Sequence, residues 1–184
     1  MSWNRIARRV RVPLGFLFAA LYLWLAHPVL WSILCGDGVV AVGLGIRALA
    51  SGYVRKNEDL ATTGPYAYTR NPLYLGSIVI AVGFALSSRS WIVLAVLFVM
   101  FLGIYLPVIR GEEAFLRERF PDFAEYERQV PRLLPRIGSL CSTPQRQQGA
   151  FSGELYLQHR EYNALAGALA MIILLAVKLA WFSR

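Results

Sequence analysis

Charged residues are scarce in this sequence, and so are the residues that most often bind metals. Only 16% of the 184 residues are charged, whereas soluble globular domains carry about a quarter. The two histidines and two cysteines form no cluster with carboxylates, which argues against a metal site. The sequence also contains no G-x-S-x-G nucleophile motif and no P-loop. These absences argue against a metalloenzyme, a serine hydrolase and a P-loop enzyme.

Apolar residues, in contrast, make up 57% of the chain and occur in long blocks. A helix that crosses a bilayer needs about 20 apolar residues. We therefore predict an all-α integral membrane protein with about five transmembrane helices. Four spans are the alternative, because the second and third blocks are short enough to be re-entrant. The blocks cover residues 13–34, 39–54, 73–86, 91–109 and 165–181.

Positive charge is concentrated on one side of this arrangement. The 19 lysines and arginines exceed the 11 acidic residues and give a net charge of +8. Most of them precede the first block, separate the second from the third, or separate the fourth from the fifth. The positive-inside rule places these segments, including the N-terminus, in the cytoplasm. Because the arginines are divided among membrane-tethered segments, we expect anionic lipid headgroups as partners and no nucleic acid.

The predicted topology also bears on individual residues of the first two blocks. The first block is too long for a signal peptide and lacks a small-residue cleavage site, so we expect a retained helix. Cys35 and Cys141 would lie on opposite membrane faces and would not form a disulfide. Arg47 lies inside the second block, where an arginine usually faces a cavity or a charged partner. Both a site wall and a structural ion pair stay open for it.

A stretch rich in turn-forming and polar residues, 63–76, leads directly into the third apolar block. It contains Gly64-Pro65-Tyr66 and Arg70-Asn71-Pro72, and it ends at Gly76. One such device is enough to start a helix, so their combination favours a shaped pocket. The short turn 87–90 predicts an antiparallel hairpin, which would return Glu112-Glu113 to the membrane face that carries Arg70. We therefore predict one composite site where lipid meets water.

The region after the hairpin is polar. Residues 111–126 predict an interfacial helix, because large apolar side chains lie among charges. Prolines make residues 130–135 an extended strip. We expect a single membrane domain over residues 1–184, with a core motif region at 40–136, a polar linker at 138–160 and a last helix at 162–182.

The order and spacing of these residues carry a resemblance to a known family. The chain resembles the isoprenylcysteine carboxyl methyltransferase and phospholipid methyltransferase family over about residues 40–136. The family pattern places a histidine or asparagine after the arginine, and here this residue is Asn71. The matching residues are Leu60, Thr62, Gly64-Pro65-Tyr66, Arg70-Asn71-Pro72-Leu73-Tyr74, Gly76, Glu112-Glu113, Leu116, Phe120, Tyr126 and Val130-Pro131-Arg132.

This resemblance implies an integral membrane enzyme that uses S-adenosylmethionine. The cofactor would occupy a cytosol-facing pocket around the hairpin, and a lipophilic substrate would enter from the bilayer. Glu112 would suit the ribose hydroxyls as a charged acceptor. The implied cofactor contacts are Glu58, Asp59, Leu60, Ala61, Tyr66, Asn71, Pro72, Leu73, Tyr74 and Glu112.

The methyl acceptor is left open between two chemical classes. A carboxylate acceptor, as in a prenylcysteine or another lipid acid, needs a cation to hold it, and Arg70 and Arg110 are the candidates. An amine acceptor, as in an ethanolamine headgroup, must lose a proton, for which Glu113 or a water molecule would serve. The basic residues favour the carboxylate. An NADPH-dependent isoprenoid or sterol reductase and a non-catalytic lipid-binding protein are the alternatives from other classes.

Overall fold

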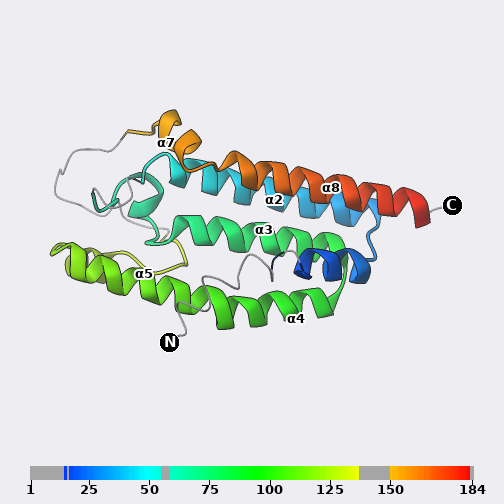
Figure 1. The fold of residues 1–184 in the computed structure, drawn as a ribbon, viewed down its shortest axis with the longest axis horizontal. Helices are drawn as coiled ribbons and strands as arrows, with labels where there is room; N and C mark the ends of the chain where they lie inside the picture. Colours follow the sequence, from blue (N-terminus) through cyan, green and yellow to red (C-terminus); the bar gives the residue numbers. More distant parts are fainter. Residues whose placement is uncertain (1–14, 16, 55–58, 137–149, 183–184) are drawn as a thin grey trace.

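In the computed structural model, the described residues (15, 17–54, 59–136 and 150–182) form helices and connecting loops, without strands. The all-α prediction is therefore confirmed for this part of the chain. Four long helical segments run side by side, with α8 beside α2, and α3 between α2 and α4 (Figure 1). After a helical segment at 17–25, the elements are α2 (Leu30–Ser51), η1 (Gly64–Ala67), α3 (Pro72–Ser88), α4 (Trp91–Met100), η2 (Phe101–Tyr105), α5 (Leu106–Arg119), α6 (Phe123–Gln129), α7 (Gly153–Gln158) and α8 (Tyr162–Phe182).

Among the described residues, three helical segments are long and apolar enough to cross a membrane. They are Leu30–Ser51, the continuous segment Trp91–Arg119, and Tyr162–Trp181. A shorter apolar helix, Pro72–Ser88, packs among them. Since the described part of the helix before α2 covers only residues 17–25, the number of five spans stays a prediction. The predicted linker at 138–160 contains the short helix α7.

The predicted boundary between the first two apolar blocks is wrong. Helix α2 runs without a break through residues 35–38, and the chain is non-helical at 26–29 instead. Pro28 explains the position, because proline lacks an amide hydrogen and disfavours a helical residue before it. The helical segment 17–25 ends at this break. The ammonium group of Lys178 in α8 donates hydrogen bonds to the carbonyls of Leu23, Trp24 and Ala26 there.

Glycines set the close approach of α2 to α3. A Cβ atom on Gly43 would lie 2.8 Å from the Gly76 carbonyl oxygen, and one on Gly36 would lie 2.5 Å from that of Gly83. The pairing is antiparallel, and the two glycines of each helix are seven residues apart, which is about two helical turns. Glycines 36 and 38 therefore belong to a helix, although they are typical of a loop in the sequence.

Replacement of Gly43 by alanine is expected to destabilise the protein by about 1–3 kcal/mol, because the added methyl group forces α2 and α3 apart. Gly45 lies on the same helix, and a Cβ atom there would meet no atom of another described helix within 4 Å, so Gly45→Ala is the matched control. The control should be neutral or slightly stabilising, because alanine favours a helix over glycine. Thermal unfolding in detergent measures both, and equal melting temperatures would contradict this account of the helix contact.

The hairpin from α3 into the long segment α4–η2–α5 carries the chain back to the end where α3 begins. Arg89 ends α3 in a left-handed conformation with φ of 52°, and Ser90 caps α4 by accepting a hydrogen bond from the Val93 amide. The π-helical turn η2 ends two residues before Pro107, and the Leu106 amide donates to the Phe101 carbonyl. A π turn accommodates such a residue without ending the helix. The acidic pair at 112–113 is thereby delivered by a single continuous helix.

The described tryptophans mark one end of the bundle. Trp24 and Trp31 flank the break before α2, Trp91 begins α4, and Trp181 lies near the end of α8. All four are between 62% and 83% exposed, and the guanidinium of Arg89 lies 5.6 Å from the Trp31 ring centre. Tryptophan is enriched at membrane–water interfaces. This end, opposite α5 and α7 in Figure 1, therefore has a composition that is typical of a membrane interface.

Candidate functional site

A cavity of about 590 Å³ lies at the other end of the bundle, where α3 begins and α5 ends. Its volume is within the range of about 300–1,000 Å³ that is typical of small-molecule sites. The walls come from the segment before η1, from η1, and from the starts or ends of α3, α5 and α6. The lining residues are Val54, Asp59, Leu60, Ala61, Tyr66, Arg70, Asn71, Pro72, Leu73, Tyr74, Glu112, Glu113, Phe115, Leu116, Phe120, Phe123 and Tyr126.

Most residues predicted for the site meet in this cavity. The hairpin does return Glu112 and Glu113 to Arg70, as the sequence predicts. Arg110 is exposed and does not line the cavity, and Glu58 is outside the described residues. The predicted residues that line it are Asp59, Leu60, Ala61, Tyr66, Arg70, Asn71, Pro72, Leu73, Tyr74, Glu112 and Glu113.

Glu113 is the centre of a buried polar cluster. Its side chain is 4% exposed, and both carboxylate oxygens are engaged. Asn71 Nδ2 donates to Oε1 at 3.1 Å, and Arg132 Nε donates to Oε2 at 2.9 Å. The Arg70 guanidinium lies 3.6 Å from Oε1. Because Asn71 also donates to the Arg132 carbonyl at 3.1 Å, an asparagine at this position joins three segments without having to titrate.

Glu112 faces the cavity from the same turn of α5. The Tyr74 hydroxyl donates to its Oε1 at 3.0 Å, and the Tyr74 ring packs edge-on against that of Tyr105. A carboxylate has about four acceptor positions, so the bond from Tyr74 leaves Glu112 able to accept from a ligand. Tyr66 is buried beside it, and burial together with the charge of Glu112 raises the pKa of the Tyr66 hydroxyl. This hydroxyl is therefore protonated at neutral pH.

Arg70 brings a guanidinium group to the wall of the cavity. Its Nη1 lies 2.6 Å from Glu127 Oε1, and the side chain is only 8% exposed. Its Nε is buried and has no hydrogen-bond partner among the described residues. Buried donors are almost always paired in folded proteins. Arg70 lines the cavity as a residue, but its Nε is enclosed by the protein.

The strip 130–136 runs alongside the segment that contains η1 and the start of α3. The Arg70 amide donates to the Pro131 carbonyl at 2.9 Å, and the Arg136 amide donates to that of Tyr68 at 3.1 Å. Buried Thr69 donates to the Arg132 carbonyl at 3.1 Å. The Tyr126 hydroxyl, from α6, donates to the Tyr66 carbonyl at 2.7 Å. These bonds fix the backbone on which Arg70 and Asn71 stand.

The sequence prediction does not include the role of Arg132 or the apolar wall of the cavity. Arg132 does not line the cavity, but it forms an ion pair with Glu113. This contact depends on the path of residues 130–136, which the sequence does not specify. The sequence assigns most of the apolar lining residues only to an interfacial helix. Their spacing is the available signal, because positions four residues apart share a helix face. The unpredicted lining residues are Val54, Phe115, Leu116, Phe120, Phe123 and Tyr126.

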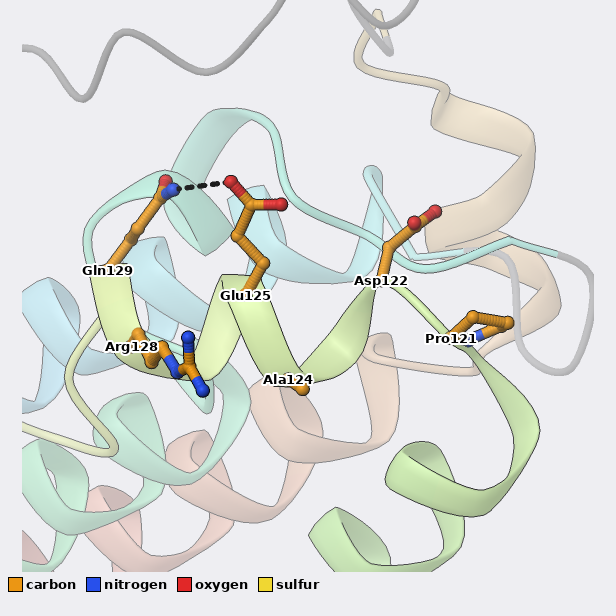
Figure 2. A pocket seen from close by; sticks show the side chains of 6 residues that line it. All are labelled: Pro121, Asp122, Ala124, Glu125, Arg128 and Gln129. Atoms are coloured by element: carbon orange, nitrogen blue, oxygen red, sulfur yellow. Dashed lines mark hydrogen bonds between the residues drawn. The ribbon is translucent and has the colours of Figure 1, made fainter.

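A second hollow lies on the outer surface of α6. Figure 2 shows its six lining side chains, all from α6 and the turn before it. Gln129 donates to Glu125 across one helical turn at 3.2 Å. The lining comes from a single element, so this hollow lacks the converging groups from several elements that characterise the first cavity.

Glu127 provides a pH-dependent contribution to the docking of α6. Hydrogen bonds from Arg117 and then Arg70 hold its pKa below the ordinary value of 4.5. A carboxyl group whose pKa is lower in the folded state stabilises the protein when the pH is above the pKa of the unfolded state. This stabilisation is lost as the pH falls through the pKa of the folded state. Glu127→Gln should therefore lower the stability at pH 7, by at most about 1 kcal/mol because the group is partly solvated.

The difference between the wild type and Glu127→Gln should then shrink as the pH falls below 4.5. Thermal unfolding in detergent, repeated at pH 7 and at a series of pH values below 4.5, measures this difference. Glu125→Gln, on the exposed face of α6, is the control. A difference that is constant over this pH range would show that the charge of Glu127 is not responsible.

Comparison with known proteins gives one family and two curated relatives. A sequence profile described as phospholipid methyltransferase matches residues 10–122. The cobalt-zinc-cadmium resistance protein CzcN of Cupriavidus metallidurans is 36% identical over 136 residues, which are 69% of this chain and 62% of that protein. The nickel-cobalt-cadmium resistance protein NccN of Alcaligenes xylosoxydans xylosoxydans is 36% identical over 115 residues, 62% of this chain and 53% of that protein. The chain thus spans less than two thirds of the length of either relative. No solved structure matches it.

Proposed function

The chain belongs to the phospholipid methyltransferase family, and from that premise we propose that its cavity binds S-adenosylmethionine for methyl transfer to a lipophilic acceptor. The family and the apolar helices make it an integral membrane protein of a methyltransferase family. The cofactor, the acceptor and the roles of the cavity residues belong to the proposal. The observation that carries it is that Glu112 lines one cavity together with Tyr66, Asn71 and Tyr74.

The residues present fit this cofactor, which has a carboxylate, ribose hydroxyls and an aromatic base. Glu112 would accept hydrogen bonds from the ribose hydroxyls. The apolar wall of Leu60, Phe115 and Leu116 would cover the base. The segment at 71–74 lines the same cavity. Asp59, Ala61 and Tyr66 are proposed as the remaining contacts.

When bound, S-adenosylmethionine supplies an electrophilic methyl group on a positively charged sulfur. The protein would contribute alignment and dryness, because methyl transfer is an in-line displacement by a desolvated nucleophile. Phe120 and Phe123 line the cavity beside its polar groups and would exclude water. Glu113 would hold Arg70 and Arg132 in place, since both of its oxygens are already engaged.

The charges in the cavity bear on the acceptor. A carboxylate acceptor, such as a prenylcysteine, needs a cation, and Arg70 is the arginine in the described lining. The acidic side chains of Asp59, Glu112 and Glu113 line the same cavity. This excess of acid favours a second candidate, a lipid amine such as an ethanolamine headgroup. Its proton would pass to water.

The cavity is proposed to face the cytoplasm. The segments that flank it carry most of the basic residues, and the tryptophan-rich end is opposite. Positively charged segments stay on the cytoplasmic side, where anionic headgroups would attract them. A lipophilic acceptor would then meet the cofactor at the inner surface of the membrane.

The experiment combines binding with transfer. Calorimetry on the purified protein in nanodiscs should show binding of S-adenosylmethionine and of its demethylated product. Labelled-methyl transfer to fractionated membrane lipids and to a prenylcysteine analogue then identifies the acceptor, an amine lipid or a carboxylate. Binding of neither cofactor form would overturn the proposal, and tighter binding of NADPH would favour the reductase alternative.

A further inference from the structure

The C-terminal segment 150–182 lies outside the matched family region of residues 10–122. It nevertheless touches the supports of the cavity at two separate places. One contact reaches the start of α3, and the other reaches the loop before η1. The first contact acts through Arg47, which lies against Gly76, and the second acts through Tyr53, which lies against Gly64. Gly64 and Gly76 are the two ends of the stretch that forms a wall of the cavity.

The first contact is the ion pair of Glu161 with Arg47. Arg47 Nε donates to Glu161 Oε2 at 3.0 Å, and its Nη2 donates to Oε1 at 2.8 Å. The two side chains are 22% and 11% exposed. Arg47 Nη1 also donates to the Leu73 carbonyl at 3.3 Å, and Leu73 lines the cavity. One arginine therefore joins the start of α8 to the backbone of the cavity wall.

Gly76 makes room for this arginine. A Cβ atom at residue 76 would lie 2.6 Å from Arg47 Cγ, so the stem of the arginine passes directly over the glycine. The Arg47 guanidinium also bonds Ser77 Oγ. The last glycine of the motif stretch is thus matched to the side chain that pairs with Glu161. The sequence leaves a role in the site wall and a structural ion pair open for Arg47. In the structure its ion pair with Glu161 also supports the wall of the cavity.

The second contact is the ring of Phe151. It covers Gly52, where a Cβ atom would lie 2.3 Å from the ring, and it packs against the Tyr53 ring at 6.3 Å between centres. The next amide, of Ser152, donates to the Gly52 carbonyl at 3.0 Å. Tyr53 in turn lies over Gly64, whose φ of 59° suits glycine. Gly64 begins η1, the turn that carries Tyr66 into the cavity.

We propose that the segment 150–182 is a positioning element of the cofactor site, acting through Glu161 on Arg47 and through Phe151 on Tyr53. The proposal rests on the proposed function. Neither Glu161 nor Phe151 lines the cavity, so their effect is transmitted through Leu73 and Gly64. The charges of Glu161 and Arg47 also influence the pKa of Tyr66, after burial and Glu112. This places the ion pair within electrostatic reach of the cavity.

Glu161→Gln tests the first contact. This substitution keeps the size of the side chain and removes its charge. The ion pair with Arg47 is lost, so the arginine holds the Leu73 carbonyl less firmly. We expect the dissociation constant for S-adenosylmethionine to rise about tenfold, which corresponds to about 1.4 kcal/mol. Calorimetry on the folded, monodisperse fraction measures it. Glu161→Asp, which retains the charge, should restore most of the affinity.

Glu154→Gln is the matched control, because Glu154 is an exposed glutamate of α7 in the same segment. It should bind the cofactor like the wild type. Phe151→Ala, with exposed Leu157→Ala as its control, tests the second contact independently and serves if Glu161→Gln does not fold. A role in folding alone would lower the melting temperature and leave the affinity of the folded fraction unchanged.

The outcomes separate the positioning role from the function on which it rests. If the wild type binds neither S-adenosylmethionine nor its product, the proposed function fails and the positioning role fails with it. If the wild type binds and Glu161→Gln and Phe151→Ala bind equally well, the proposed function stands and the positioning role is refuted. Weaker binding in these variants but not in their controls supports the positioning role.

Discussion

Replacement of Glu112 by alanine is expected to abolish measurable binding of S-adenosylmethionine. Glu112 is the acceptor that we assign to the ribose hydroxyls, and it lines the cavity where Tyr74 fixes its orientation. Hydrogen bonds to a charged group contribute about 1.5–3 kcal/mol each. Loss of two such bonds would raise the dissociation constant by about a hundredfold or more. Calorimetry with the cofactor and its demethylated product measures this effect.

Two further variants make the result specific to this carboxylate. Glu118→Ala removes an exposed glutamate from the same helix and should bind like the wild type. Glu112→Gln keeps an acceptor for Tyr74 but lacks the charge, so its affinity should be intermediate. Full affinity in a folded Glu112→Ala protein would place the ribose elsewhere and would remove the main support for our assignment of the cavity.

The second large effect is expected on stability, from replacement of Glu113 by alanine. This carboxylate is buried and neutralises Arg132 and Arg70 while it accepts from Asn71. Breaking a buried ion pair by removing one partner costs about 3–5 kcal/mol. The cost here is expected at the lower end of that range, because Arg70 still pairs with Glu127 and Arg132 is 37% exposed. We expect a large fall in the melting temperature and poor recovery of folded protein from membranes.

The same variant distinguishes a structural role of Glu113 from a catalytic one. Glu113→Gln retains the volume and should recover part of the stability, whereas exposed Glu118→Ala should be nearly neutral. A Glu113→Ala protein with normal stability and cofactor affinity, but without methyl transfer, would contradict our view. It would instead support the sequence-based hypothesis that Glu113 accepts a proton from an amine substrate.

The meeting of Arg70 with Glu112 and Glu113 could be predicted because it depends on local features. A short turn between two apolar helices makes an antiparallel pair, and the length of the hairpin then decides which residues face each other. The pairing of Arg47 with Glu161 could not be predicted in this way. The two residues are 114 positions apart, and the intervening chain carries no spacing that relates them.

The misplaced helix break has a similar physical cause. Gly36 and Gly38 are typical of a loop when their neighbours in space are unknown. In the structure Gly36 is required by the carbonyl of Gly83 on a neighbouring helix, so the glycine serves packing between helices. Pro28 was the better local signal, because its effect on the backbone does not depend on tertiary contacts.

The separation of the described tryptophans from the cavity has a practical consequence for work in vesicles. Trp24, Trp31, Trp91 and Trp181 are exposed at one end of the bundle, so intrinsic fluorescence reports on that surface and not on ligand binding. With Trp3 replaced by phenylalanine, these four are the remaining fluorophores of their kind. A water-soluble quencher outside sealed proteoliposomes would then reach them in one insertion direction. The unquenched fraction of the emission would give the proportion of molecules whose cavity faces outward.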